Sequence, residues 1–285
     1  MIPSLSIFGM ACSALLAIGF PVVLLVFWHK KTHASYAAAG VGALMFLVFA
    51  MVLEQLLHTV VLRPDGFVAN TTWAYVLYGA LAAGVFEETG RFVGFRFLMK
   101  REPQRAAGVM YGIGHGGIEA VLVGGTAAIS NLLFAIQYNA GALAGSAPYD
   151  TAAQTIASTA PGLFFVSGIE RIIAVCLHIA LSVLVFTAVN RAGRLWLYPL
   201  AILLHAGVDV FAALYQRGLL TSVWLVELFV ALATAAVAAY ARRVYLADRD
   251  PVPEPAAVPA AADAPAEAPD AGDDTGEGSG SGRIG

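Results

Sequence analysis

Long apolar runs dominate this chain of 285 residues and restrict it to a membrane-spanning fold. The hydrocarbon core of a bilayer is about 30 Å thick, and a helix needs about 20 apolar residues to cross it. Since lipid offers no partners for backbone polar groups, each such run predicts a helix. The runs of sufficient length cover residues 4–28, 36–62, 72–99, 106–137, 161–189, 195–216 and 219–241. The sequence therefore predicts an all-α membrane protein, a bundle of about seven transmembrane helices.

Composition agrees with this fold class. Charged residues make up only 12% of the chain and hydrophobic residues 59%, whereas a soluble domain carries about 25% charged residues. The fourth and fifth runs are longer than one crossing needs, so an eighth span near Gly141 is the alternative to seven. The two cysteines, Cys12 and Cys176, lie in separate apolar runs and predict no disulfide framework.

The basic residues lie in every second loop between these runs. Lysine and arginine are retained on the cytoplasmic side of a membrane. Eleven of the sixteen basic residues fall on one side by this alternation, and two, Arg63 and Arg217, fall on the other. The pattern predicts an N-terminus outside, a cytoplasmic C-terminus and a multi-pass protein of the cell membrane.

The end of the chain differs in composition from the rest. Nine of the nineteen acidic residues lie between Asp248 and Glu277, in a stretch rich in proline, alanine and glycine. Such a segment cannot bury enough apolar surface to offset the entropy lost on ordering. We therefore expect a transmembrane domain over residues 1–246 and a disordered acidic cytoplasmic tail over 247–285. No nucleic-acid-binding patch and no cofactor-binding loop is visible.

Ionisable residues within the spans are the strongest functional signal. Each costs about 2.5–3.5 kcal/mol at the centre of a helix on insertion scales, and such residues usually mark a site. They occur on four different runs. The candidate site residues are Glu87, Glu88, Arg91, His115, Glu119, His178, His205 and Asp209.

These residues also lie at a common depth. Counted from the nearest cytoplasmic basic residue, Glu88, His115, His178 and His205 lie 12, 10, 13 and 11 residues into their spans. At about 1.5 Å per residue, each is roughly 15–20 Å from that end of its helix. Unrelated polar residues would scatter in depth, so the pattern predicts one cluster.

Such a cluster has the groups that hydrolysis of a peptide bond requires. Glutamate and histidine can together activate water, polarise the scissile carbonyl and protonate the leaving amine, with assistance from aspartate and arginine. Glu88 is favoured as the base, with Glu87 as its partner. Alternatively, His115, His178 and His205 with a carboxylate could hold a divalent metal such as zinc. The residues leave the glutamate and metal mechanisms open.

The order of short motifs carries a family resemblance. Glu87-Glu88-x-x-Arg91, Tyr111-x-x-x-His115 and His205-x-x-x-Asp209 follow the motif order of PrsW-type and CAAX-protease membrane peptidases. Most closely, residues 5 to 245 resemble the YhfC family of intramembrane peptidases. The resemblance implies an intramembrane endopeptidase, of glutamic type or metal-assisted, that acts on a membrane protein or peptide within or beside the lipid bilayer.

Three other functions would use similar residues. A proton-coupled transporter carries glutamate, histidine and aspartate chains near the membrane midplane. A haem protein would use intramembrane histidines as axial ligands. A non-catalytic scaffold, such as an immunity-like protein, would keep the architecture without the reaction. Neighbouring carboxylates and arginines favour acid–base chemistry over haem ligation. A transporter would be favoured by internal repeats, which are not evident in the sequence. The scaffold stays an open alternative to the peptidase.

Overall fold

A computed structural model describes residues 1–250 of the chain, and these residues are helical and connected by short loops. Each of the seven predicted runs forms one long helical segment. Their bounds are α1 (Ser4–Thr32); α2 (Tyr36–Phe46), η1 (Leu47–Glu54) and α3 (Gln55–Val61); α5 (Thr72–Val93) and η2 (Gly94–Leu98); α6 (Arg105–Glu119), η3 (Ala120–Gly125) and α7 (Thr126–Asn139); α9 (Pro161–Asn190); α10 (Leu197–Gln216); and α11 (Val223–Ala247). The three η segments are π-helical turns within longer helices.

Six of these segments are long and apolar enough to cross a membrane. The remaining one, α5 with η2, has the length but carries Glu87, Glu88, Arg91 and Arg96. The all-α membrane bundle is thus confirmed. The stretch considered for an eighth span holds only α8 (Ala147–Ser158), whose 12 residues extend about 18 Å and are too few to cross.

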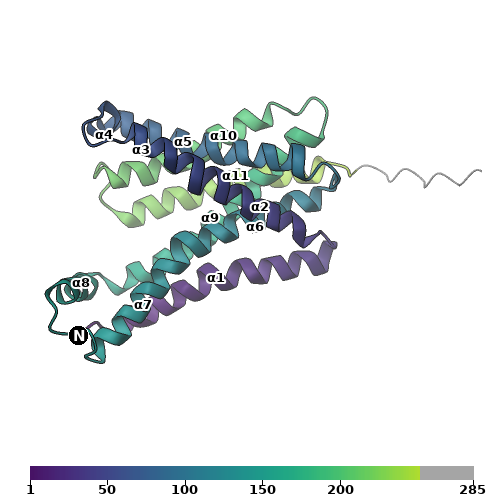
Figure 1. Ribbon diagram of the computed structural model, residues 1–285. Coiled ribbons are helices and arrows are strands. Elements are labelled where there is room, and N and C mark those ends of the chain that lie inside the picture. The colour runs from purple at the N-terminus through teal and green to yellow at the C-terminus, as the bar shows by residue number, and fades with distance from the viewer. Residues whose placement is uncertain (251–285) are drawn as a thin grey trace, which may run out of the picture. The chain divides into compact units, whose positions relative to one another are not determined.

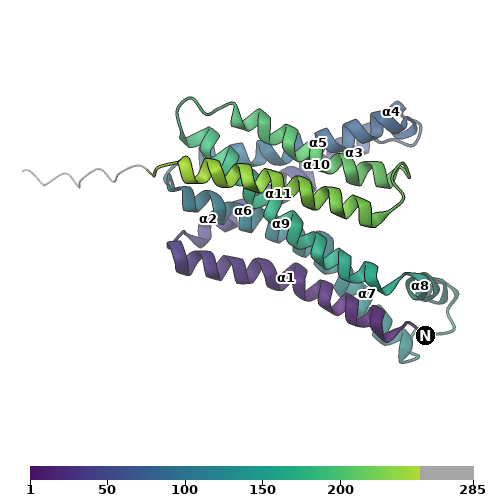
Figure 2. The same cartoon turned by 180° about the vertical axis from the view of Figure 1, so that it is seen from behind.

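The helix α9 occupies the centre of the bundle. It contacts α1, α5, α6, α10 and α11, and 67% of its most apolar stretch is buried. Figures 1 and 2 show α9 between one layer that holds α1 and α7 and another that holds α2, α5, α10 and α11. A residue on α9 can therefore meet side chains from both layers.

Glycines allow the helices around α9 to pack closely. A Cβ at Gly114 of α6 would lie 2.0 Å from the carbonyl oxygen of Ala39 on α2, and one at Gly42 would lie 2.2 Å from that of Tyr111. On another face of α6, a Cβ at Gly112 would lie 2.6 Å from Cα of Ile179. Small residues permit such approaches between membrane helices, and here they fix α6 against both α2 and α9.

The loops predicted to face the cytoplasm gather at one end of the bundle. Nε of Arg191 donates to Oδ1 of Asp248 at 2.5 Å, and the backbone N–H of Arg105 donates to Oδ1 of Asp250 at 2.6 Å. Residues 247–250 of the expected tail are thus held against two neighbouring loops, and the rest of that tail lies outside the described residues. The orientation of this end in a membrane stays a prediction.

Candidate functional site

Helices α5, α6, α9 and α10 bring all eight candidate residues into one connected network. Glu88, Arg91 and His115 have no exposed surface, His178 and His205 are 3% exposed, and Glu87 is 7% exposed. Two π-helical turns adjoin the network, because η2 begins three residues after Arg91 and η3 directly follows Glu119. Such turns are frequent at functional sites.

One part of the network joins Glu88 to α10. The guanidinium of Arg91 donates to Oε1 of Glu88 through Nη1, one helical turn away on α5. The same oxygen accepts a hydrogen bond from Nδ1 of His205 at 2.7 Å. Nε2 of His205 lies 3.4 Å from Oδ2 of Asp209. The buried imidazole is therefore held between two carboxylates.

The other part joins Glu87 to α6 and α9. Oε2 of Glu87 lies 2.8 Å from Nε2 of His115 and 3.7 Å from Nδ1 of His178. One ligand atom from each of these three residues lies within 4.8 Å of the other two. The sequence offered His115, His178 and His205 together with a carboxylate as a possible metal site, whereas this compact group consists of Glu87, His115 and His178 without His205.

The contacts of His178 define its tautomer. Nη2 of Arg91 donates to Nδ1 of His178 at 2.5 Å, and arginine has no acceptor. Nδ1 therefore carries the lone pair, and the N–H at Nε2 points to Oε2 of Glu119, with which it pairs. Nη1 of Arg171 donates to Oε1 of Glu119 at 3.3 Å. Glu119 thus orients one imidazole while an arginine balances its charge.

The network borders a polar cavity of about 130 Å³. Glu87, Glu119, His178, His205 and Asp209 line this cavity, together with residues of α11. Glu88 and Arg91 do not line it, which agrees with their complete burial. A molecule in the cavity therefore meets Glu87 but is separated from Glu88.

Three polar residues near the site were not assigned a role from the sequence. The hydroxyl of Ser182 accepts a hydrogen bond from Nε of Arg91 at 3.2 Å, and a single serine in an apolar helix gives no signal of this. Thr234 of α11 lines the cavity and its buried hydroxyl lacks a partner among the described residues. Arg171 shares a face with His178, seven residues away, which could have pointed to its contact with Glu119.

The donor set suits a divalent transition metal in its chemistry. Two imidazoles and one carboxylate are a common set of zinc ligands in catalytic sites, where a further position stays open. Metal-bound histidines usually donate their second N–H to a carboxylate, and Glu119 is such a partner for His178. Glu87 and His115 share a proton across 2.8 Å. A cation bound by these two residues would displace that proton. These residues therefore fit a metal.

Comparison with known proteins identifies the family. A family model described as YhfC intramembrane metalloprotease matches residues 12–230, more than half of the chain. The chain belongs to the YhfC family. It is also 37% identical over 261 residues to the uncharacterized membrane protein YhfC of Bacillus subtilis (strain 168), an alignment that covers 86% of this chain and 100% of that relative. The resemblance drawn from the motifs is thus confirmed, and the chain is a multi-pass membrane protein of a metalloprotease family.

Proposed function

We propose that this chain hydrolyses a peptide bond of a membrane protein or membrane-associated peptide in the cavity lined by Glu87, His178, His205 and Asp209. The observation that carries the proposal is the buried Glu87, His115 and His178 group beside that cavity, in a chain of the YhfC metalloprotease family. Carboxylate and imidazole are the groups that such a hydrolysis needs.

In this proposal Glu87, His115 and His178 hold a divalent metal. When bound, such an ion supplies Lewis acidity, which activates water and polarises the scissile carbonyl. Glu119 keeps His178 in the tautomer whose Nδ1 lone pair faces Glu87 and Arg91. Since orienting carboxylates raise the basicity of a histidine ligand, Glu119 is proposed as a positioning residue.

We propose His205 as the group that holds a proton at the cavity and gives it to the leaving amine. Nδ1 of His205 lies 2.7 Å from Glu88, and Nε2 lies 3.4 Å from Asp209. Each carboxylate therefore favours a proton on the nitrogen next to it. Arg91 holds Glu88 in place from the opposite side. Asp209 is one-third exposed on its side chain, which provides a route for the proton to be replaced.

The geometry favours the reverse of the expected order of the two glutamates. Glu88 has no exposed surface and is engaged by Arg91 and His205. Glu87 lines the cavity and keeps 7% of its surface exposed. We therefore assign contact with water and metal to Glu87 and a supporting role to Glu88.

Cleavage of a panel of tagged membrane peptides by detergent-purified protein tests this proposal. We expect Glu87→Gln and His205→Ala each to lower cleavage by at least about 100-fold, the lower range for removal of an acid or base. Glu102→Gln, in the loop between η2 and α6, is the matched control and keeps cleavage. Equal cleavage by all variants would remove the proposed site.

A further inference from the structure

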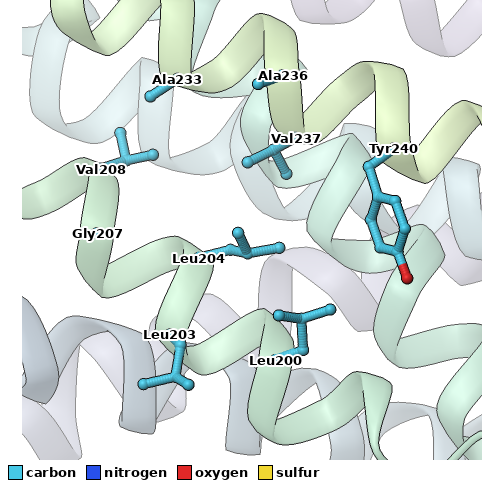
Figure 3. Close-up of a pocket in the computed structure, with 9 residues that line it drawn as sticks. All are labelled: Leu200, Leu203, Leu204, Gly207, Val208, Ala233, Ala236, Val237 and Tyr240. Carbon is cyan, nitrogen blue, oxygen red and sulfur yellow. The ribbon is translucent and has the colours of Figure 1, made fainter.

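An apolar groove lies between α10 and α11 on the outside of the bundle. It has a volume of about 500 Å³ and extends over about two turns of α10. Figure 3 shows the leucines of α10 and the alanine and valine side chains of α11 that line it, with Tyr240 at one end. The lining residues are Leu200, Leu203, Leu204, Gly207, Val208, Ala233, Ala236, Val237 and Tyr240. Its chemistry suits a hydrocarbon chain.

A second cavity of about 480 Å³ adjoins the groove and has the opposite character. Arg191, Arg194, Arg243 and Arg249 line it, and Tyr240 lines both this cavity and the groove. Arg191 is paired with Asp248 and Asp250. Among residues 1–250, no carboxylate pairs with the other three arginines. The cavity therefore retains positive charge at the end of an apolar channel.

We propose that the arginine cavity and the groove together bind one anionic phospholipid. Guanidinium groups form paired, charge-assisted hydrogen bonds with phosphate oxygens, which a neutral surface cannot replace. The phosphate lies among Arg194, Arg243 and Arg249, and one acyl chain lies between α10 and α11. The basic loops of a membrane protein also face the leaflet that is rich in anionic lipid, and the alternation of charges predicts this for these arginines.

The joined shape distinguishes such a site from general attraction to a charged membrane. A row of surface arginines attracts any anionic lipid without fixing its chains. Here Tyr240 connects the charged cavity to an apolar groove, so headgroup and chain can be held together. Gly207 widens the groove, because a Cβ at that position would meet no atom within 4 Å.

Photocrosslinking of the full chain in detergent tests the proposal. The probes are phosphatidylglycerol and phosphatidylcholine, each with the same diazirine-bearing acyl chain. We expect phosphatidylglycerol to label peptides of α10 and α11, and phosphatidylcholine to label them far less. Arg194→Gln with Arg243→Gln should lower labelling by roughly fivefold for each arginine removed. Arg242→Gln, adjacent on α11 but outside the cavity, is the control and should change labelling less than twofold.

A second pair of variants tests the groove without changing charge. Gly207→Leu fills it and should lower labelling, whereas Gly79→Leu, whose Cβ also meets no atom within 4 Å, should not. Equal labelling by both lipids, equal loss in Arg242→Gln, or unchanged labelling in Gly207→Leu would each overturn the proposal. Labelling that appears only after removal of residues 251–285 would also overturn it, because the acidic tail would then occupy the cavity.

Discussion

Nη2 of Arg91 lies 2.5 Å from Nδ1 of His178, so a guanidinium from α5 faces the lone pair of an imidazole on α9. The same side chain pairs with Glu88 and lies 3.8 Å from Glu87. Arg91 therefore connects both parts of the network and balances two buried carboxylates. Because Nδ1 of His178 has a single lone pair, a cation held by the Glu87, His115 and His178 group would displace the guanidinium from that nitrogen.

Replacing Arg91 should destabilise the bundle because it leaves buried carboxylates without their counter-charge. Loss of one partner of a buried ion pair typically costs about 3–5 kcal/mol, so Arg91→Leu should unfold at a clearly lower temperature in detergent. Arg91→Leu combined with Glu88→Leu should recover part of that stability without recovering cleavage. A single variant as stable as the wild type would contradict the charge-balancing role.

The metal content of purified variants should distinguish the residues that bind the metal from the other residues of the cluster. We expect Glu87→Ala and His115→Ala to lose bound divalent metal, measured by elemental analysis of the purified protein. His205→Ala should keep the metal but lose cleavage, because His205 faces Glu88 and Asp209. Loss of metal in His205→Ala would instead support the three-histidine set expected from the sequence.

Chelation should give the complementary result. Extended dialysis of the wild type against a chelator is expected to abolish cleavage, and added zinc should restore it. Glu119→Gln should weaken metal affinity by about 10–100-fold, the usual effect of removing an orienting carboxylate. Cleavage that survives complete removal of metal would favour the glutamate mechanism.

Close helix packing predicts a strong effect of a single methyl group. Gly114→Ala places a carbon 2.0 Å from the carbonyl oxygen of Ala39, whereas a Cβ at Gly79 would meet no atom within 4 Å. Overpacking typically costs about 1–3 kcal/mol, so thermal unfolding of Gly114→Ala should occur at a lower temperature than that of Gly79→Ala. Similar midpoints for the two variants would show that α2 and α6 can separate at low cost.

The predicted orientation can be measured by labelling single cysteines in whole cells. In a background without Cys12 and Cys176, Ala144→Cys should react with a membrane-impermeant maleimide from outside. Arg101→Cys should react only after the cells are opened. The opposite result would reverse the assignment of the basic loops to the cytoplasm.

Most of the fold could be predicted because each apolar run became one helix. The predicted and observed ends differ most for the last helix, which was predicted over 219–241 and is observed over Val223–Ala247. Ser222 has an extended backbone before the helix, which delays its start, and the exposed residues Arg242 and Arg243 continue the same helix beyond the apolar run. The hydropathy of the sequence alone predicts neither the later start nor the extension of this helix.

The site could be predicted as a cluster but not in its detailed pairing. Depth along each helix follows from counting residues, which is why Glu88, His115, His178 and His205 are found together. The rotation of each helix about its axis depends on packing, which the sequence does not display. A Cβ at Gly84 of α5 would lie 2.7 Å from the carbonyl oxygen of Ile202 on α10, and this close contact helps to direct His205 toward Glu88.

Val208 lines both the apolar groove and the polar cavity, and it is 4% exposed. The isopropyl group of Val208 thus forms a partition between an apolar groove and a cavity lined by carboxylates and imidazoles. A valine side chain has one strongly preferred rotamer in a helix, so this partition is stiff. At this position the bundle therefore separates an apolar space from a polar one by the thickness of a single side chain.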